Sequence, residues 1–168
     1  MKSIELHTDR LWMRPYAIED VDALHQLWCD PNVRRHLFDD KIVPREFVVE
    51  EVNDTQNDFA VHGWGQCSVF LRETNELIGF CGFRIMEGSP APQLIYGVAP
   101  SCWGQGLATE MTLRMIEFGF EDCGFKQILG STDFANAASR RVLEKAGMRF
   151  QQRVHQDGLD LVYFAIAL

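Results

Sequence analysis

The sequence has no long apolar run. A helix that crosses a bilayer needs about 20 consecutive apolar residues, and no stretch of the chain approaches that length. The first residues, Met1 to His7, also lack the continuous apolar segment of a signal peptide. We therefore expect a soluble, cytoplasmic protein with no membrane partner.

Cysteine pairs at the spacing of metal or redox sites are also absent. The five cysteines are an odd number, and no two of them form a Cys-x-x-Cys pair. A disulfide framework and a zinc knuckle both depend on paired cysteines. We therefore expect reduced thiols and no bound metal.

Basic residues are in the minority. The chain has 16 Lys and Arg against 24 Asp and Glu, which gives a formal net charge of -8 at pH 7. Binding to nucleic acid needs a basic face that neutralises phosphates, so we expect no nucleic-acid partner. The negative charge instead favours the approach of cationic partners such as amines or basic peptides.

The apolar residues predict a mixed α+β fold. With 168 residues and 46% hydrophobic content, residues 1–168 suit one domain with a single core, as a monomer or homodimer. Helices are expected over residues 19–29, 44–62, 109–121 and 136–146, and strands over 5–15, 66–72, 77–86, 93–99, 127–131, 149–155 and 159–167. The first strand ends at Pro15 and is expected at a sheet edge, whereas residues 32–43 lack periodicity and are expected to link two helices. Strands 93–99 and 127–131 run parallel if the helix between them is a right-handed crossover.

The segment between residues 98 and 110 carries the clearest functional signal. A strand ends at Ala99, a turn contains Pro100, Gly104 and Gly106, and a helix follows. The first N–H groups of a helix have no partner within it, and the helix dipole places positive charge there, so such a turn suits a phosphate. The segment matches neither a Walker loop nor a dinucleotide-binding fingerprint.

This segment resembles the acetyl-coenzyme A pyrophosphate loop of the GNAT acetyltransferase superfamily, written Gln/Arg-x-x-Gly-x-Gly/Ala. Trp103 stands at the first position, which departs from the pattern, while Gly106 and Ala108 match the fourth and sixth. The string Trp-Gly-Gln-Gly-Leu-Ala-Thr-Glu, like the opening Thr-Asp-Arg-Leu-x-x-Arg-Pro, resembles the branch of the bacterial ribosomal-protein N-terminal acetyltransferases. Residues 136–148 resemble the second GNAT signature, Asn-x-x-Ser-x-x-x-(Leu/Tyr)-Glu-Lys-x-Gly-Phe, except that Met148 replaces Phe.

The resemblance implies a fold and a set of site residues. The fold would be a central, mostly antiparallel twisted sheet of about seven strands with a parallel central pair, flanked by about four helices. Acetyl-coenzyme A (acetyl-CoA) would be the co-substrate, without a metal. It would contact Val98, Ala99, Trp103, Gly104, Gln105, Gly106, Leu107, Ala108, Thr109, Asn136 and Ser139. Asn136 and Ser139 would also be catalytic residues, although Asn136 equally fits a helix N-cap and Ser139 an exposed helix position.

The sequence names no general base. Many members of the superfamily carry a Tyr acid where this chain has Leu143, and a Glu where it has Gln93. A backbone N–H of Val98 or Ala99 would stabilise the oxyanion. The candidates for the base by chain position are Tyr96, Asp133, His155 and Glu87. A proton that leaves through water, with catalysis mainly by positioning, is the alternative.

The resemblance implies an N-acetyltransferase that transfers acetyl directly from acetyl-CoA to a primary amine. The expected acceptor is the N-terminal α-amine of a ribosomal or other protein or peptide. A small cationic amine, such as a polyamine, an antibiotic or an amino-acid derivative, is the alternative acceptor. A coenzyme A-binding or sensing module without turnover is the other alternative, and Gln93 and Leu143 favour it.

Overall fold

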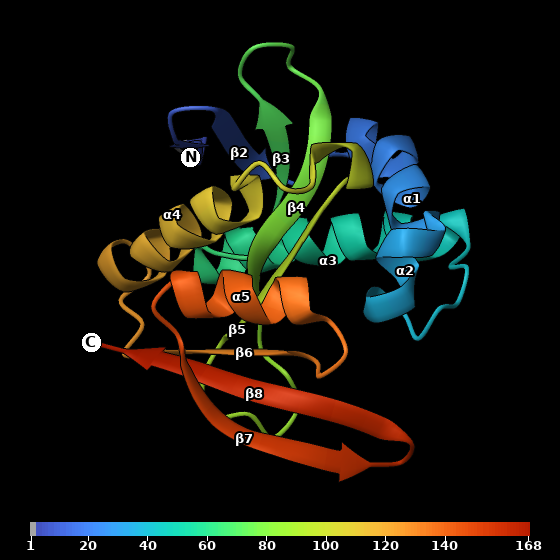
Figure 1. Cartoon of the computed structure of the whole chain (residues 1–168). Coiled ribbons are helices and arrows are strands. Elements are labelled where there is room, and N and C mark those ends of the chain that lie inside the picture. Colours follow the sequence, from blue (N-terminus) through green and yellow to red (C-terminus); the bar gives the residue numbers. More distant parts are fainter. Residues whose placement is uncertain (1–2) are drawn as a thin grey trace.

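One eight-stranded sheet organises the chain, with the strand order β1-β2-β3-β4-β5-β6-β8-β7 (Figure 1). The computed structural model describes residues 3–168. The strands are β1 (Leu6–His7), β2 (Leu11–Pro15), β3 (Gln66–Leu71), β4 (Leu77–Arg84), β5 (Gln93–Val98), β6 (Gln127–Asp133), β7 (Arg149–Gln156) and β8 (Leu159–Ala167). Neighbouring strands are antiparallel except β5 and β6, which confirms the expected parallel central pair.

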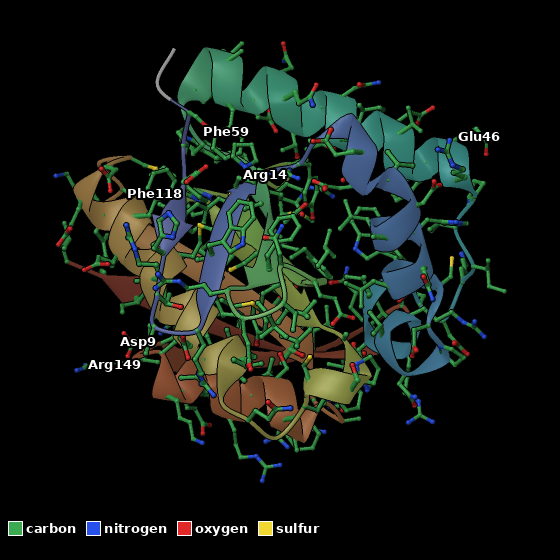
Figure 2. All side chains as sticks on the ribbon, turned by 90° about the horizontal axis from the view of Figure 1, so that it is seen from above. Asp9, Arg14, Glu46, Phe59, Phe118 and Arg149 are labelled. Carbon is green, nitrogen blue, oxygen red and sulfur yellow. The ribbon has the colours of Figure 1, made fainter. Side chains whose placement is uncertain are left out.

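Helices cover both faces of the sheet. The described residues form α1 (Val21–Cys29), α2 (Pro31–Leu37), α3 (Arg45–His62), α4 (Leu107–Glu121) and α5 (Ala137–Lys145), with 3-10 turns η1 (Ile18–Asp20) and η2 (Pro100–Cys102). In Figure 2, α3 lies along one side of the sheet and α4 and α5 lie on the other. Within residues 3–168, none of these helices is long and apolar enough to span a membrane.

Two apolar clusters fill the space between the sheet and its helices. One cluster contains Met111 of α4 and Leu143 of α5, and the other contains Leu24 of α1 and Val48 of α3. Successive side chains of a strand point to opposite faces, so β5 contributes to both clusters. Consequently each residue of β5 and β6 can be assigned to the face of α4 and α5 or to the face of α1 to α3.

The parallel strands β5 and β6 separate soon after they begin. Within residues 3–168 their ladder holds one residue pair, Gln93 with Leu129, although the strands continue to Val98 and Asp133. Strand β6 is paired along its whole length with β8 instead. We call the opening between residues 94–98 and 130–133 the wedge.

The N-terminal strand differs from the expectation. Residues 5–15 form two strands, β1 and β2, and β2 lies between β1 and β3 rather than at the sheet edge. The break lies at Thr8, whose N–H donates to the Leu11 carbonyl (2.9 Å) and whose hydroxyl accepts from the Leu11 N–H (3.0 Å). A local side chain to backbone bond of this kind closes a turn that alternation alone does not reveal.

The expected linker over residues 32–43 is also wrong, because it contains most of α2. Asp30 caps this helix by accepting a hydrogen bond from the Asn32 N–H (2.8 Å), and Pro31 occupies its first turn. Val33 and Leu37 of this helix are partly buried against the apolar cluster of α1 and α3, and two apolar positions are too few to reveal a helical period. The described residues thus hold eight strands and five α-helices, one more of each than expected.

Candidate functional site

The turn between β5 and α4 exposes a row of backbone donors. Gly104 and Gly106 have φ values of 74° and 77°, in the left-handed region that favours glycine. Within the described part of the chain, the N–H groups of residues 104–109 donate to no acceptor, and the first bonded one is that of Glu110, to the Gly106 carbonyl (3.0 Å). Six unpaired donors at the positive end of a helix form an arrangement that can hold a phosphate.

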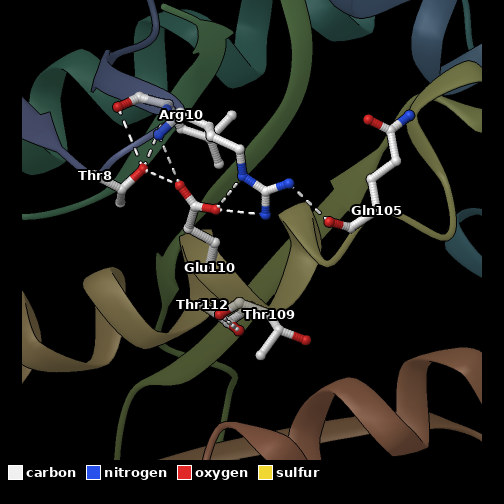
Figure 3. A network of polar contacts seen from close by, with 7 residues as sticks. Thr8, Arg10, Gln105, Thr109, Glu110 and Thr112 are labelled. Carbon is white, nitrogen blue, oxygen red and sulfur yellow. Dashed lines mark hydrogen bonds and ion pairs between the residues drawn. The ribbon is translucent and has the colours of Figure 1, made fainter.

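A network of polar contacts holds this turn from the β1–β2 side (Figure 3). Arg10 Nη1 donates to the Gln105 carbonyl (2.9 Å), and Arg10 Nε donates to Glu110 (2.7 Å). The Thr8 hydroxyl also donates to Glu110 (2.6 Å). Burial opposes the ionisation of Glu110, but the bonds from Thr8 and Arg10 outweigh it and lower its pKa. These contacts use only oxygens of the turn and helix, so the donor row stays free.

Trp103 closes the turn. Its indole N–H donates to the Val98 carbonyl (2.8 Å), while its side chain remains 53% exposed. This bond occupies the carbonyl of the last residue of β5. Trp103, which stands where the superfamily pattern has Gln or Arg, thus links the turn to the end of β5.

The edge of β5 that faces the wedge carries open backbone groups. The Ala99 N–H donates to the Ile78 carbonyl (2.7 Å), and hydrogen-bonded pairs alternate along an antiparallel ladder. The N–H groups of Tyr96 and Val98 therefore point away from β4, into the wedge. Of the two alternative oxyanion donors that the sequence suggests, the Ala99 N–H is bonded to β4 and the Val98 N–H is open.

Asn136 and Ser139 lie at the start of α5, and Ser139 contacts Tyr96 of β5 on the face of α4 and α5. Asn136 is the N-cap of α5, and its side-chain oxygen accepts from the Ser139 N–H (3.1 Å). The Ser139 and Tyr96 hydroxyls lie 2.6 Å apart. Burial raises the pKa of Tyr96 far above its ordinary value, and the hydrogen bond to Ser139 offsets only part of the rise. Tyr96 is therefore protonated at neutral pH and unsuited to act as a base.

The opposite face of the wedge carries two polar pairs. Gln93 Nε2 donates to the Ser131 hydroxyl (2.5 Å), which joins β5 to β6 where the strands part. His36 Nδ1 of α2 lies 2.7 Å from the carboxylate of Asp133, the last residue of β6. The sequence suggested Asp133 as a candidate base but missed His36, because 97 positions separate the two residues.

The two remaining candidate bases lie elsewhere. His155 is exposed on the β7–β8 hairpin, 3.5 Å from Asp160. Glu87 lies in the exposed turn between β4 and β5, before the first residue of β5, whereas the wedge opens toward the last. Neither residue belongs to the site that the other candidates form.

Comparison with known proteins supports these observations. Residues 10–149 match the family described as Acetyltransferase (GNAT) domain. The N-acetyltransferase p20 of Bacillus licheniformis is 30% identical over 142 residues, which cover 82% of this chain and 78% of p20. The FsC-acetyl coenzyme A-N(2)-transacetylase of Aspergillus fumigatus is 28% identical over 160 residues, which cover 85% of this chain and 64% of that enzyme.

Crystal structures of other proteins share this fold. One is an acetyl transferase of Salmonella typhimurium that modifies the N-terminal serine of the 50S ribosomal subunit protein L7/L12, with a TM-score of 0.79 and 19% identity over 96% of both chains. At this identity the likeness establishes the fold alone. The family match covers residues 10–149, and the likeness to p20 extends over most of both chains. The chain therefore belongs to the GNAT acetyltransferase family, and it is an N-acetyltransferase that uses acetyl-CoA.

Proposed function

We propose that the six N–H groups of residues 104–109 bind the pyrophosphate of acetyl-CoA and that its pantetheine arm enters the wedge. The unpaired donors are the observation that carries this proposal. The open N–H group of Tyr96 supplies a pairing site for an amide of the arm, as an added strand would use it. Asn136 and Ser139 flank the arm from α5.

In this arrangement the protein promotes the reaction by aligning the amine with the thioester and by stabilising the transition state with backbone dipoles. A neutral amine attacks the thioester carbonyl carbon, and negative charge develops on the carbonyl oxygen. The Val98 N–H, unlike that of Ala99, has no partner in the β4 ladder and is the proposed donor to that oxygen. Collapse of the intermediate gives the acetylated amine and coenzyme A.

We further propose that the acceptor is the α-amine of a protein or peptide N-terminus, including that of a ribosomal protein. Helix α2 borders the wedge, because its His36 contacts Asp133 at the end of β6. The net charge of -8 favours a cationic amine. The likeness to the Salmonella enzyme supports a protein acceptor, whereas the likeness to the FsC transacetylase supports a small-molecule acceptor.

A paired acceptor screen tests this proposal. The probes are a peptide with a free N-terminal serine, the same peptide with a blocked N-terminus, and spermidine, each incubated with acetyl-CoA. We expect thiol release and a mass increase of one acetyl group with the free peptide alone. Release with spermidine alone would favour the small-amine acceptor. Binding of acetyl-CoA without release from any acceptor would support the sensing module and refute catalysis.

Replacement of Asn136 tests its proposed contact with the arm. We expect Asn136→Ser to lower kcat about tenfold, the effect of one lost hydrogen bond in the transition state, with little change in the Kd of acetyl-CoA. Serine is as good an N-cap as asparagine, so α5 should remain folded. Asn136→Ala removes both functions and should also lower stability by about 1 kcal/mol. Full turnover by Asn136→Ser would leave Asn136 with a capping role only.

A further inference from the structure

The two faces of the wedge carry different chemistry. On β6, Ile128 and Gly130 face the apolar cluster of α4 and α5, so Ser131 and Asp133 point to the opposite face. On β5, Ile95 packs in the cluster of α1 and α3. The His36–Asp133 pair therefore lies on the side opposite the α5 residues that flank the proposed arm.

Because the arm is proposed to lie on the first face, the second face is left for the acceptor amine. The Tyr96–Ser139 contact joins β5 to α5 on the first face, where the arm is proposed to lie. The second face receives alternate side chains of residues 93–99 and 129–133, namely Gln93, Ile95, Ala99, Leu129, Ser131 and Asp133. Asp133 is the one ionisable side chain in this set, and its partner is an imidazole.

The geometry of the pair suits proton transfer. A carboxylate 2.7 Å from Nδ1 favours the tautomer that carries its proton on Nδ1, which leaves a lone pair on Nε2. The His36 and Asp133 side chains are 26% and 31% exposed, so the ring is held in place but remains within reach of a substrate. Gln93 is bonded to Ser131 and, as an amide, cannot take this role.

We propose that His36 is the general base for the acceptor amine and that Asp133 is its positioning residue. This inference rests on the proposed function. As the amine nitrogen forms its bond to the acetyl carbon, its proton passes to His36 Nε2, and the oxyanion forms. When the C–S bond breaks, the coenzyme A thiolate takes the proton of the imidazolium, so that His36 returns to its neutral form.

Two variants separate a base from a structural link between α2 and β6. The amide nitrogen of Asn occupies nearly the place of Nδ1, so His36→Asn keeps the hydrogen bond to Asp133 but has no group basic enough to take the amine proton. His36→Ala removes both. We expect at least a hundredfold lower kcat in each variant, the usual contribution of a general base, with an unchanged Kd for acetyl-CoA. The assay is thiol release with the free N-terminal serine peptide and with spermidine.

Added imidazole supplies a readout that a structural role would not change. We expect added imidazole to raise the kcat of His36→Ala at least tenfold. It should not raise the kcat of His36→Asn, because the amide side chain occupies the space that the imidazole ring leaves. Asp133→Asn should lower kcat without such rescue. Nearly full activity of His36→Asn, or loss in His36→Ala without rescue, would overturn the base assignment. An inactive parent enzyme that binds acetyl-CoA would instead refute the proposed function, and the base assignment with it.

Discussion

Gly106→Val is expected to raise the Kd of acetyl-CoA about a hundredfold, or ~2.7 kcal/mol of binding free energy. Gly106 lies in the middle of the six unpaired N–H groups, and its φ is 77°. A valine there must carry a branched side chain in a left-handed conformation, which costs about 2 kcal/mol or turns the N–H groups away. Its methyl groups would also obstruct the approach of a phosphate. Isothermal titration with acetyl-CoA measures the change.

The matched control is Gly124→Val, beyond the other end of α4. Gly124 has a similar φ of 71°, and a Cβ added there meets nothing within 4 Å. The two variants therefore share the backbone strain, and both should unfold at lower temperature. The Kd of acetyl-CoA should change only for Gly106→Val. An equal loss of affinity in both variants, or none in either, would contradict the placement of the pyrophosphate.

The features that the sequence predicted correctly depend on local backbone conformation. Gly104 and Gly106 lie in the expected turn, where they occupy left-handed positions, and Asn136 is the N-cap of α5. Such positions accept few residue types, so they are visible as signatures. The parallel pair followed from the handedness of the crossover, which is nearly invariant.

The features that the sequence did not predict depend on tertiary contacts. Helix α2 contributes two partly buried apolar residues, Val33 and Leu37, which are too few to reveal a helical period, so the sequence predicts a linker for the segment that carries His36. The His36–Asp133 pair joins two segments that no local pattern connects. Likewise, the pairing of β6 with β8 encloses the wedge on one side, but alternation within a strand does not identify its neighbour.

The interior also holds an ionic site that ties the first helical turns to the sheet. Asp20 of η1 is 4% exposed and accepts from Arg14 Nη1 (2.7 Å) and Nη2 (2.9 Å). It also accepts from the Ala17 N–H (2.9 Å) and the Ser68 hydroxyl (2.7 Å). The hydrogen bond to Asp20 raises the pKa of Arg14, although partial burial acts against the rise. One carboxylate thus joins β2, β3 and the start of α1.

Asp20→Ala should therefore lower the free energy of unfolding by about 3 kcal/mol, because it leaves the Arg14 guanidinium and the Ser68 hydroxyl without their partner. For a chain of this length the expected fall in Tm is about 10 °C. Asp22→Ala is the control, since Asp22 is 83% exposed and pairs with Arg45 at the surface (2.7 Å).

Both substitutions remove one negative charge, so a change in net charge affects them equally. A surface ion pair contributes about 0.5 kcal/mol to the free energy of unfolding. The Tm of Asp22→Ala should therefore lie within about 2 °C of that of the parent protein. The difference between the two variants in thermal and urea unfolding then measures the effect of burial. Equal stability of the two variants would mean that water replaces Asp20 as the partner of Arg14, and that the start of α1 is held by its apolar contacts alone.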